Sequence, residues 1–411
     1  MPRRFRASAA PSCSPLFTLA AKDSGRGGHG TARTGRYLQG TAGAGTISTE
    51  ETKKEPTTVN VLTTEKLAPL PDQPADLFWP TADWPTGDLP PETDKKRLMK
   101  LMDHAFAAQA PADLGETHAV VVIKGGKLVH EQYWTGFGPE VTCPSWSKGK
   151  SITHALVGIL AGDGKMDIHA PADIPEWRDP ADPRHAITLD QLLRMSSGLA
   201  FREDYVPDHP SDVIEMLWGA GKEDTAHFAA SFPLEHEPGT YWSYASGTTN
   251  IVSRAAARAA NLSGAEFESF MRRRLFDPLG MTSAEPKFDP AGTFIGSSFC
   301  FCTPRDFARF GLLYLRDGVW EGRRLLPEGW VDYARTPTWQ QPGAEEGPYG
   351  AHWWLGIAGP ASFSANGYEG QYTVVVPELD MVVVRHGKTP LDMKLNPKSW
   401  IADVVDCFRT V

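Results

Sequence analysis

Residues 143–156 read CPSWSKGKSITHAL, and a helical pattern begins inside this stretch. From Ser147 onward, apolar residues recur at helical spacing until the glycines at 162 and 164: Ile152, Ala155, Leu156, Ile159 and Leu160. Positions i and i+3 of a helix share one face, with Cβ atoms about 5–6 Å apart, so Ser147 and Lys150 should meet there. Burial lowers the proton affinity of a lysine, and the positive helix N-terminus favours a serine alkoxide. The stretch therefore predicts a Ser-x-x-Lys nucleophile pair, although a serine that only caps the helix fits the same pattern.

Other motifs overlap this stretch or lie close to it. Ser145 and Lys148 have the same spacing, but this pair begins before the helical pattern and directly follows Pro144. Residues 149–151, Gly-Lys-Ser, resemble the end of a phosphate-binding loop, but that motif requires a glycine where the proline stands. The His-Glu pair at residues 130–131 lacks the second histidine of a zinc-protease motif. We therefore expect no metal and no organic cofactor, and the first of these pairs stays open as an alternative nucleophile centre.

Composition excludes several classes of function. The 411 residues include 41 Lys and Arg against 50 Asp and Glu, a formal net charge of −9, whereas nucleic-acid binders normally present a basic face. No apolar run reaches the roughly 18 residues of a membrane-spanning helix. Five cysteines are too few for a disulfide scaffold, so we expect reduced, buried thiols. We predict a protein with no nucleic-acid partner and no membrane span, and the sequence leaves the oligomeric state open.

The N-terminal region differs in composition from the rest of the chain. The first 40 residues hold seven Lys or Arg and one Asp, are rich in Gly, Ser, Thr and Ala, and show no periodicity. Residues 1–60 are therefore predicted to be a disordered basic extension, and residues 61–93, with seven prolines, an extended segment. The apolar run near the start is too short for the core of a secretory signal, which predicts a cytoplasmic location. The folded domain should span residues 94–411.

Beyond residue 94, strand patterns at both ends of the domain flank a helical middle. Residues 94–110 are predicted to form a helix, and the runs 119–124 and 127–134 a hairpin around Gly125-Gly126. The last part of the chain predicts four strands and a closing helix: residues 353–357, 362–366, 372–376, 381–386 and 398–408. The middle, about residues 145–335, is predicted to be a mostly helical lobe. The expected fold class is α/β of the α+β kind, an antiparallel sheet built from both chain ends and flanked by helices.

Several further segments, in order along the chain, resemble one family of enzymes. Besides Ser147–Lys150, these segments are Thr188–Leu199, Phe201–Tyr205, Tyr244–Ser246, Cys302–Gly311 and Gly367–Gln371. The likeness as a whole spans about residues 95–410. Their content and order are similar to serine hydrolases of the β-lactamase and penicillin-binding-protein fold. The likeness is to the class C β-lactamase-like branch, which includes esterases and 6-aminohexanoate-dimer hydrolases. The resemblance implies a β-lactamase/transpeptidase-like fold and a serine hydrolase without a cofactor.

The resemblance also implies roles for individual residues. It makes Ser147 the nucleophile, Lys150 its partner and Tyr244 the second proton-transfer group. Ser246 stands where class C enzymes have an asparagine, a departure that weakens recognition of a lactam side-chain amide. Tyr205 corresponds to the tyrosine that contacts the substrate amide in nylon-oligomer hydrolases. Ser246 and Tyr205 are therefore expected to bind substrate.

The third element of the family is a Lys-Thr-Gly or His-Thr-Gly sequence on the strand that lines the site. Residues 388–390, Lys-Thr-Pro, lie after the last predicted strand and lack the glycine, so the matching position is Ala365-Asn366-Gly367. The asparagine and glycine of this position are then substrate-binding, and the backbone N–H groups of Ser147 and Tyr368 form the expected oxyanion hole. The cation that would bind the carboxylate of a penicillin or a peptide is missing, which argues against β-lactams and peptidoglycan stems.

The sequence thus predicts two-step acyl transfer from a small-molecule ester or amide. A carboxylesterase, or an amidase similar to the 6-aminohexanoate-dimer hydrolases, is the first interpretation. A β-lactamase or D,D-peptidase is the alternative. A non-catalytic binding module is a further one, because a fold does not fix a function. The acyl group and the leaving group are left open.

Overall fold

The structure is a computed structural model and describes residues 67–204, 211–344, 347–393 and 396–409. The predicted disordered extension, residues 1–60, lies outside the described residues and stays a prediction, as does the division of the chain at residues 61 and 94. Within the described ranges, no helix combines the length and the apolar composition needed to cross a membrane.

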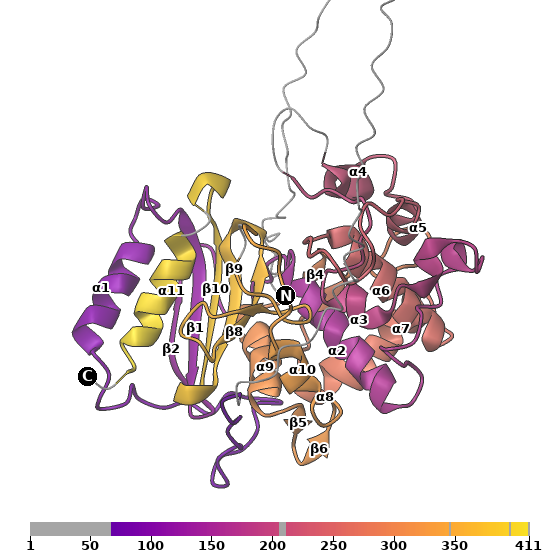
Figure 1. Cartoon of the computed structure of the whole chain (residues 1–411). Helices are drawn as coiled ribbons and strands as arrows, with labels where there is room; N and C mark the ends of the chain where they lie inside the picture. Colours follow the sequence, from indigo (N-terminus) through magenta and orange to yellow (C-terminus); the bar gives the residue numbers. More distant parts are fainter. Residues whose placement is uncertain (1–66, 205–210, 345–346, 394–395, 410–411) are drawn as a thin grey trace, which may run out of the picture. The chain divides into compact units, whose positions relative to one another are not determined.

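Six strands of the described residues form one antiparallel sheet, in which the two ends of the domain meet (Figure 1). In spatial order they are β2 Lys127–Tyr133, β1 Glu116–Lys124, β10 Met381–Lys388, β9 Gln371–Val376, β8 Phe363–Gly367 and β7 Trp354–Leu355. β1 pairs with β10 so that Val121 lies opposite Val384. Valine runs make β9 and β10 buried along nearly their whole length, as expected for central strands covered on both faces.

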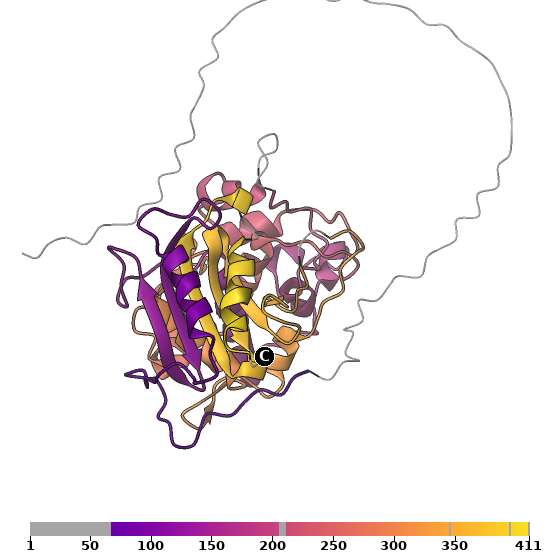
Figure 2. The ribbon, with the colours of Figure 1, turned by 90° about the vertical axis from the view of Figure 1, so that its left-hand side faces the viewer.

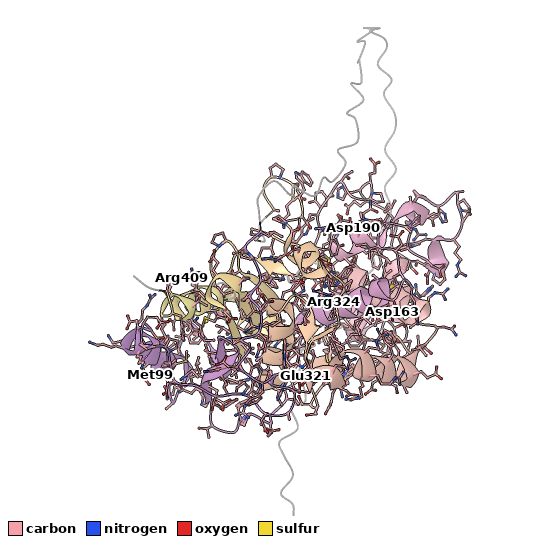
Figure 3. All side chains as sticks on the ribbon, turned by 90° about the horizontal axis from the view of Figure 1, so that it is seen from below. Met99, Asp163, Asp190, Glu321, Arg324 and Arg409 are labelled. Atoms are coloured by element: carbon pink, nitrogen blue, oxygen red, sulfur yellow. The ribbon has the colours of Figure 1, made fainter. Side chains whose placement is uncertain are left out.

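Two terminal helices, α1 Lys95–Ala105 and α11 Asn396–Asp406, cover one face of the sheet and lie side by side in Figure 2. Their apolar residues pack with every second residue of the central strands, because successive strand side chains point to opposite faces. This layer contains Leu98, Met102, Trp400, Ile401, Val120, Val122, Val374 and Val383. In Figure 3, Met99 on α1 and Arg409 just after α11 mark the side of the domain that these helices cover. Asp163 and Asp190 mark the helical lobe on the opposite side.

The other face of the sheet packs against α2 Lys148–Gly162 and α9 Pro304–Leu315. Gly311 lets α9 approach closely, since a Cβ at this position would lie 2.7 Å from Val382 Cγ1. The lobe continues outward with α3 Leu189–Leu193, α4 Asp212–Trp218, α5 Thr225–Ala230, α6 Ser246–Ala259, α7 Gly264–Met271, α8 Asp277–Leu279 and α10 Trp330–Arg335. Two small strand pairs complete it: β3 Glu285–Pro286 with β4 Cys300–Phe301, and β5 Val319–Trp320 with β6 Arg323–Arg324. The helix α2 is therefore enclosed between the sheet and α6.

The fold class expected from the sequence is confirmed, and some element boundaries differ. The β1–β2 hairpin closes at Gly125-Gly126, and both glycines have positive φ angles, as the predicted two-residue turn needs. The first helix ends at Ala105 instead of residue 110, because the residues beyond Phe106 have no core to pack against. The last strand continues to Lys388, since Glu116 of β1 still pairs with it there. Lys388 therefore belongs to the strand, a correction to its expected place beyond it.

Residues 67–93 lie against α9 and the β5–β6 pair. Two buried arginines hold this segment by donating to its carbonyls: Arg309 of α9, whose Nε donates to Pro80 O at 2.6 Å, and Arg316 directly after α9, whose Nη1 donates to Pro71 O at 3.2 Å. Gly280 has a φ of +70°, and a Cβ there would lie 1.7 Å from the carbonyl oxygen of Thr81. The segment is thus bound by polar contacts to its backbone and by close packing.

Candidate active site

The chain enters α2 through a sharp turn that places Ser147 at the junction. Trp146 has a φ of +44°, and Ser147 is the N-terminal cap residue of the helix. Gly149 allows the first turn to approach its neighbours, because a Cβ there would lie 2.6 Å from the carbonyl oxygen of Gly296. The residues of α2 from Lys148 to Leu160 are buried, so the polar groups of its first turn lie in an environment with little water.

The structure brings the predicted pair Ser147 and Lys150 together. Lys150 Nζ lies 2.9 Å from Ser147 Oγ, one helical turn away. The same nitrogen lies 2.9 Å from Ser246 Oγ and donates to the carbonyl oxygen of Ser297 at 3.1 Å. The Lys150 residue is 1% exposed. A buried amine within hydrogen-bond distance of a hydroxyl at a helix N-terminus is the arrangement that can accept the proton of that hydroxyl.

Tyr244 lies next to this amine. The centroid of its ring is 4.8 Å from Lys150 Nζ. The ring packs on Trp354, with centroids 5.2 Å apart, and on Tyr349, with centroids 6.0 Å apart. Tyr244 precedes α6 by two residues, so the helix that supplies Ser246 also positions this ring. The three side chains predicted to carry the chemistry therefore share one site.

Ser246 connects Lys150 to a carboxylate that the sequence interpretation gave no role. Its hydroxyl donates to Glu203 Oε1 at 2.9 Å, and its backbone N–H donates to Glu203 Oε2. Glu203 belongs to the loop that follows the matched segment 188–199. It lies within the segment Phe201–Tyr205 that carries part of the resemblance, but that segment assigned a role only to Tyr205, and nothing in the sequence indicates that a carboxylate 43 residues before Ser246 contacts it.

The end of β8 packs against the turn that carries Ser147. A Cβ at Gly367 would lie 2.4 Å from the carbonyl oxygen of Ser145 and 3.1 Å from Trp146 Cβ. Tyr368 follows directly, and its ring meets that of Trp146 edge-on with centroids 5.6 Å apart. The structure thus places the two segments with the predicted oxyanion N–H groups in contact. Asn366 also lies on β8, and its Oδ1 is buried without a hydrogen-bond partner in the described part of the chain.

Tyr205, predicted to bind substrate, lies outside the described residues, so its role stays a prediction.

The alternative pair, Ser145 and Lys148, is directed to other partners. Ser145 Oγ donates to the carbonyl oxygen of Ser298 at 3.1 Å and accepts from Cys300 N at 2.9 Å. Lys148 Nζ lies 2.8 Å from His386 Nε2 and 3.2 Å from the centroid of the Phe307 ring. Ser145 and Lys148 are each 0% exposed. This geometry favours Ser147 with Lys150 as the reactive pair.

His352 is a second residue near the site that the sequence did not indicate. Its Nδ1 lies 2.7 Å from the carbonyl oxygen of Leu193, and its Nε2 lies 3.0 Å from Thr249 Oγ1. Its own carbonyl oxygen accepts from Ser151 Oγ at 2.7 Å. The pKa of His352 is lowered to about 3, chiefly by burial and in smaller part by the charge of Lys150, while the hydrogen bond to Leu193 O opposes the shift, so the ring is neutral. The histidine therefore connects α2, α6 and the end of α3 around Lys150.

A cavity of about 540 Å³ opens beside Tyr244 and Glu203. Aromatic and polar side chains line it: Arg202, Glu203, Glu235, Trp242, Tyr244 and Gln341. Arg202 and Glu235 pair across it with an N–O distance of 2.8 Å. Within the described ranges, His, Cys, Asp and Glu side chains nowhere gather in a group of three that could hold a metal ion.

Comparison with known proteins shows the family of the chain. The chain belongs to the Beta-lactamase family, whose model matches residues 112–394. It is 27% identical over 292 residues to a 6-aminohexanoate-dimer hydrolase of Paenarthrobacter ureafaciens, and the aligned region covers 67% of this chain and 73% of that protein. It is 26% identical over 207 residues to a lovastatin esterase of Penicillium rubens, covering 49% of this chain and 44% of that protein.

A solved structure shares the fold. It is that of a Bacillus anthracis protein with the provisional name of a 6-aminohexanoate-dimer hydrolase, with a TM-score of 0.63 and 22% identity. The match covers 84% of this chain and 90% of that one. Together with the family match, these relatives confirm the predicted class: the protein is a β-lactamase-related serine hydrolase.

Proposed function

We propose that the protein hydrolyses small-molecule esters or amides by acyl transfer to Ser147. One observation carries the proposal: the buried Lys150 amine lies 2.9 Å from the Ser147 hydroxyl at the start of α2. An amine at this distance can act as general base for the attack of the hydroxyl on a carbonyl carbon. The relatives named as a dimer hydrolase and an esterase support amide and ester substrates.

The proposed reaction has two steps. Lys150, with Tyr244, takes the proton of Ser147 as its oxygen attacks the carbonyl, and the negative charge collects at the N–H groups of Ser147 and Tyr368. The proton then passes to the departing alcohol or amine, and the acyl group stays on Ser147. In the second step the same pair removes a proton from water, which releases the acid and restores the enzyme.

By the resemblance, Ala365-Asn366-Gly367 of this chain stands at the position where penicillin-recognising enzymes hold a cation, and it contains no basic residue. The aromatic rings of Trp146, Phe299 and Tyr368 lie near the nucleophile, with centroids of neighbouring pairs 5.6 to 5.7 Å apart. Such a surface suits an uncharged acyl group better than a carboxylate-bearing one. We therefore rank esters and amides with uncharged acyl groups above β-lactams and D,D-peptides.

The decisive experiment is labelling with a fluorophosphonate probe. We expect label on the wild type, loss of label in Ser147→Ala, strong loss in Lys150→Ala, and retained label in Ser145→Ala. Ser151→Ala is the matched control, because this serine lies on the same helix and donates to the carbonyl oxygen of His352. Retained label in Ser147→Ala would contradict the assigned nucleophile, and an unlabelled wild type would support a non-catalytic binding module.

A substrate panel completes the test. Rates with p-nitrophenyl esters and short amides are expected to exceed those with nitrocefin by at least about 100-fold, because the cationic carboxylate contact is missing. Rapid nitrocefin turnover would instead favour the β-lactamase alternative.

A further inference from the structure

Glu203 ends a hydrogen-bonded chain that begins at the nucleophile. The chain runs from Ser147 Oγ to Lys150 Nζ at 2.9 Å, on to Ser246 Oγ at 2.9 Å, and on to Glu203 Oε1 at 2.9 Å. Its members come from α2, the start of α6 and the loop after residue 199. Lys150 and Ser246 are each 1% exposed, so water competes little for their hydrogen bonds.

The chemistry of the partners fixes the direction of the hydrogen bonds from Lys150 to Ser246 and to Ser297. A hydroxyl group has one hydrogen to donate, and the hydrogen of Ser246 goes to the Glu203 carboxylate, which can only accept. Ser246 Oγ must therefore accept a hydrogen from Lys150. The carbonyl oxygen of Ser297 can also only accept, and it too receives a hydrogen from Lys150 Nζ.

These two bonds orient the amine toward the nucleophile. A neutral amine has two N–H groups and one lone pair. When Ser246 and Ser297 accept the two hydrogens, the lone pair is left on the side of the nitrogen that faces Ser147 Oγ. As an ammonium, Lys150 donates to Ser147 Oγ. As a neutral amine, it accepts the hydrogen of the Ser147 hydroxyl instead, which is the state that the first step of acyl transfer requires.

We propose that Glu203 is a positioning residue, which fixes the Ser246 hydroxyl as an acceptor and so directs the Lys150 lone pair at Ser147. The inference rests on the proposed function, because it assigns Glu203 to the same acyl-transfer centre. A carboxylate is required in this role. The amide of glutamine would present an NH₂ group to Ser246 Oγ, and the serine hydrogen would then turn to Lys150 and compete for its lone pair.

Glu203 also has a purely structural contact, which the experiment must separate. Its second oxygen accepts the backbone N–H of Ser246 at the start of α6, where a negative charge stabilises the helix. Glu203→Gln keeps an oxygen for this N–H, and Ser246→Ala keeps the N–H itself. Asp94→Asn is the matched control, because Asp94 accepts from Arg97 N at 2.9 Å at the start of α1, on the opposite face of the sheet.

The test compares wild type, Glu203→Gln, Ser246→Ala and the double variant in p-nitrophenyl ester hydrolysis. We expect kcat to fall by roughly 10- to 100-fold in each single variant, with KM within about threefold, because the loss is in proton transfer. The double variant should be no slower than the slower single variant, since Glu203 acts through the Ser246 hydroxyl. Asp94→Asn should change thermal stability alone and leave kcat at the wild-type value.

Each other outcome has a definite meaning. A wild type that the fluorophosphonate does not label overturns the proposed function, and this inference with it. A labelled wild type with unchanged kcat in Glu203→Gln, or with losses that multiply in the double variant, overturns the inference alone. If Glu203→Gln fails to fold, Ser246→Ala still decides the question, and an unchanged kcat in that variant overturns the inference.

Discussion

Lys148 is a buried amine beside the nucleophile, and its removal should change how stability depends on pH. Its Nζ lies between His386 Nε2 and the Phe307 ring, and among the described residues no carboxylate pairs with it. Burial lowers its pKa from the ordinary 10.5 to about 7, and the opposing effect of Cys302 is smaller. We expect Lys148→Met to raise the free energy of unfolding at pH 6, because methionine fills similar space without a charge.

The size of the effect follows from the two pKa values. Between pH 7 and 10.5 the unfolded chain holds the proton of Lys148 and the folded chain does not, so wild-type stability from this group rises with pH. The slope is about 1.4 kcal/mol per pH unit, and the full difference is on the order of 5 kcal/mol. Below pH 7 both states are protonated and the penalty is complete. The advantage of Lys148→Met should therefore be largest at pH 6 and shrink as the pH rises to 10.

Urea unfolding, followed by tryptophan fluorescence at pH 6, 7, 8 and 9, measures this advantage directly. The difference between variant and wild type cancels the titration of all other groups. Lys165→Met is the control, because Lys165 is exposed and its loss removes a charge without emptying the core. An advantage that does not vary between pH 7 and 9 would refute the reasoning. It would mean that the folded protein keeps Lys148 as an ammonium, with a thiolate of Cys143, Cys300 or Cys302 as its counter-charge.

Three further predictions concern packing and protonation. Gly367→Ala should lower the rate of acylation at least about 10-fold, since its Cβ would lie 2.4 Å from Ser145 O and displace the end of β8. Gly280→Ala should destabilise the protein by more than about 2 kcal/mol in urea unfolding, because of its φ of +70° and the contact with Thr81 O. Between pH 6.5 and 4 the unfolded chain binds a proton at His352 that the folded chain does not bind, so the free energy of unfolding falls as the pH falls. His352→Gln should remove this contribution, and the slope of the free energy of unfolding against pH should then be smaller by the equivalent of about one proton, about 1.4 kcal/mol per pH unit.

Matched variants test the cause of each effect. Gly138→Ala and Gly322→Ala place a Cβ where no atom lies within 4 Å, and Gly322 has a φ of +72°, so the second separates backbone strain from collision. His169→Gln removes an exposed histidine instead of a buried one. Normal acylation in Gly367→Ala, equal losses in Gly280→Ala and Gly322→Ala, or equal pH slopes for His352→Gln and wild type would each contradict the corresponding argument.

Local patterns in the sequence were sufficient for much of the fold. The hairpin at Gly125-Gly126 and the helix after Ser147 depend on neighbouring residues, and both were predicted with nearly the observed bounds. The pattern of strands at both chain ends predicted one antiparallel sheet, but the order of its strands was not predicted, because that order depends on pairing between residues far apart in the chain, as in Val121 with Val384. The end of the first helix was wrong by five residues, because propensity continues after Phe106 and the packing surface does not.

In the candidate site, the sequence indicated the residues that are close in the chain and missed the contacts between distant residues. The spacing of Ser147 and Lys150 is local, so the sequence could indicate that pair, and the resemblance added Tyr244. Glu203 and Ser297 reach the same centre from 43 residues before Ser246 and 147 residues after Lys150. Such contacts exist only once the lobe has folded around α2, and no pattern in the sequence records them.

The two lysines of the first turn of α2 show why spacing alone cannot identify the base. Both are almost completely buried, and each lies three residues after a serine. Lys148 meets a neutral imidazole and an aromatic ring, and among the residues that the structure describes no oxygen accepts from its nitrogen. The contacts of Lys150 include the carbonyl oxygen of Ser297, which can only accept, the hydroxyl of Ser246, whose own hydrogen goes to Glu203, and the hydroxyl of Ser147 at the helix N-terminus. Burial makes either amine easier to deprotonate, but only the second is held so that its lone pair faces a hydroxyl, and that difference comes from its partners.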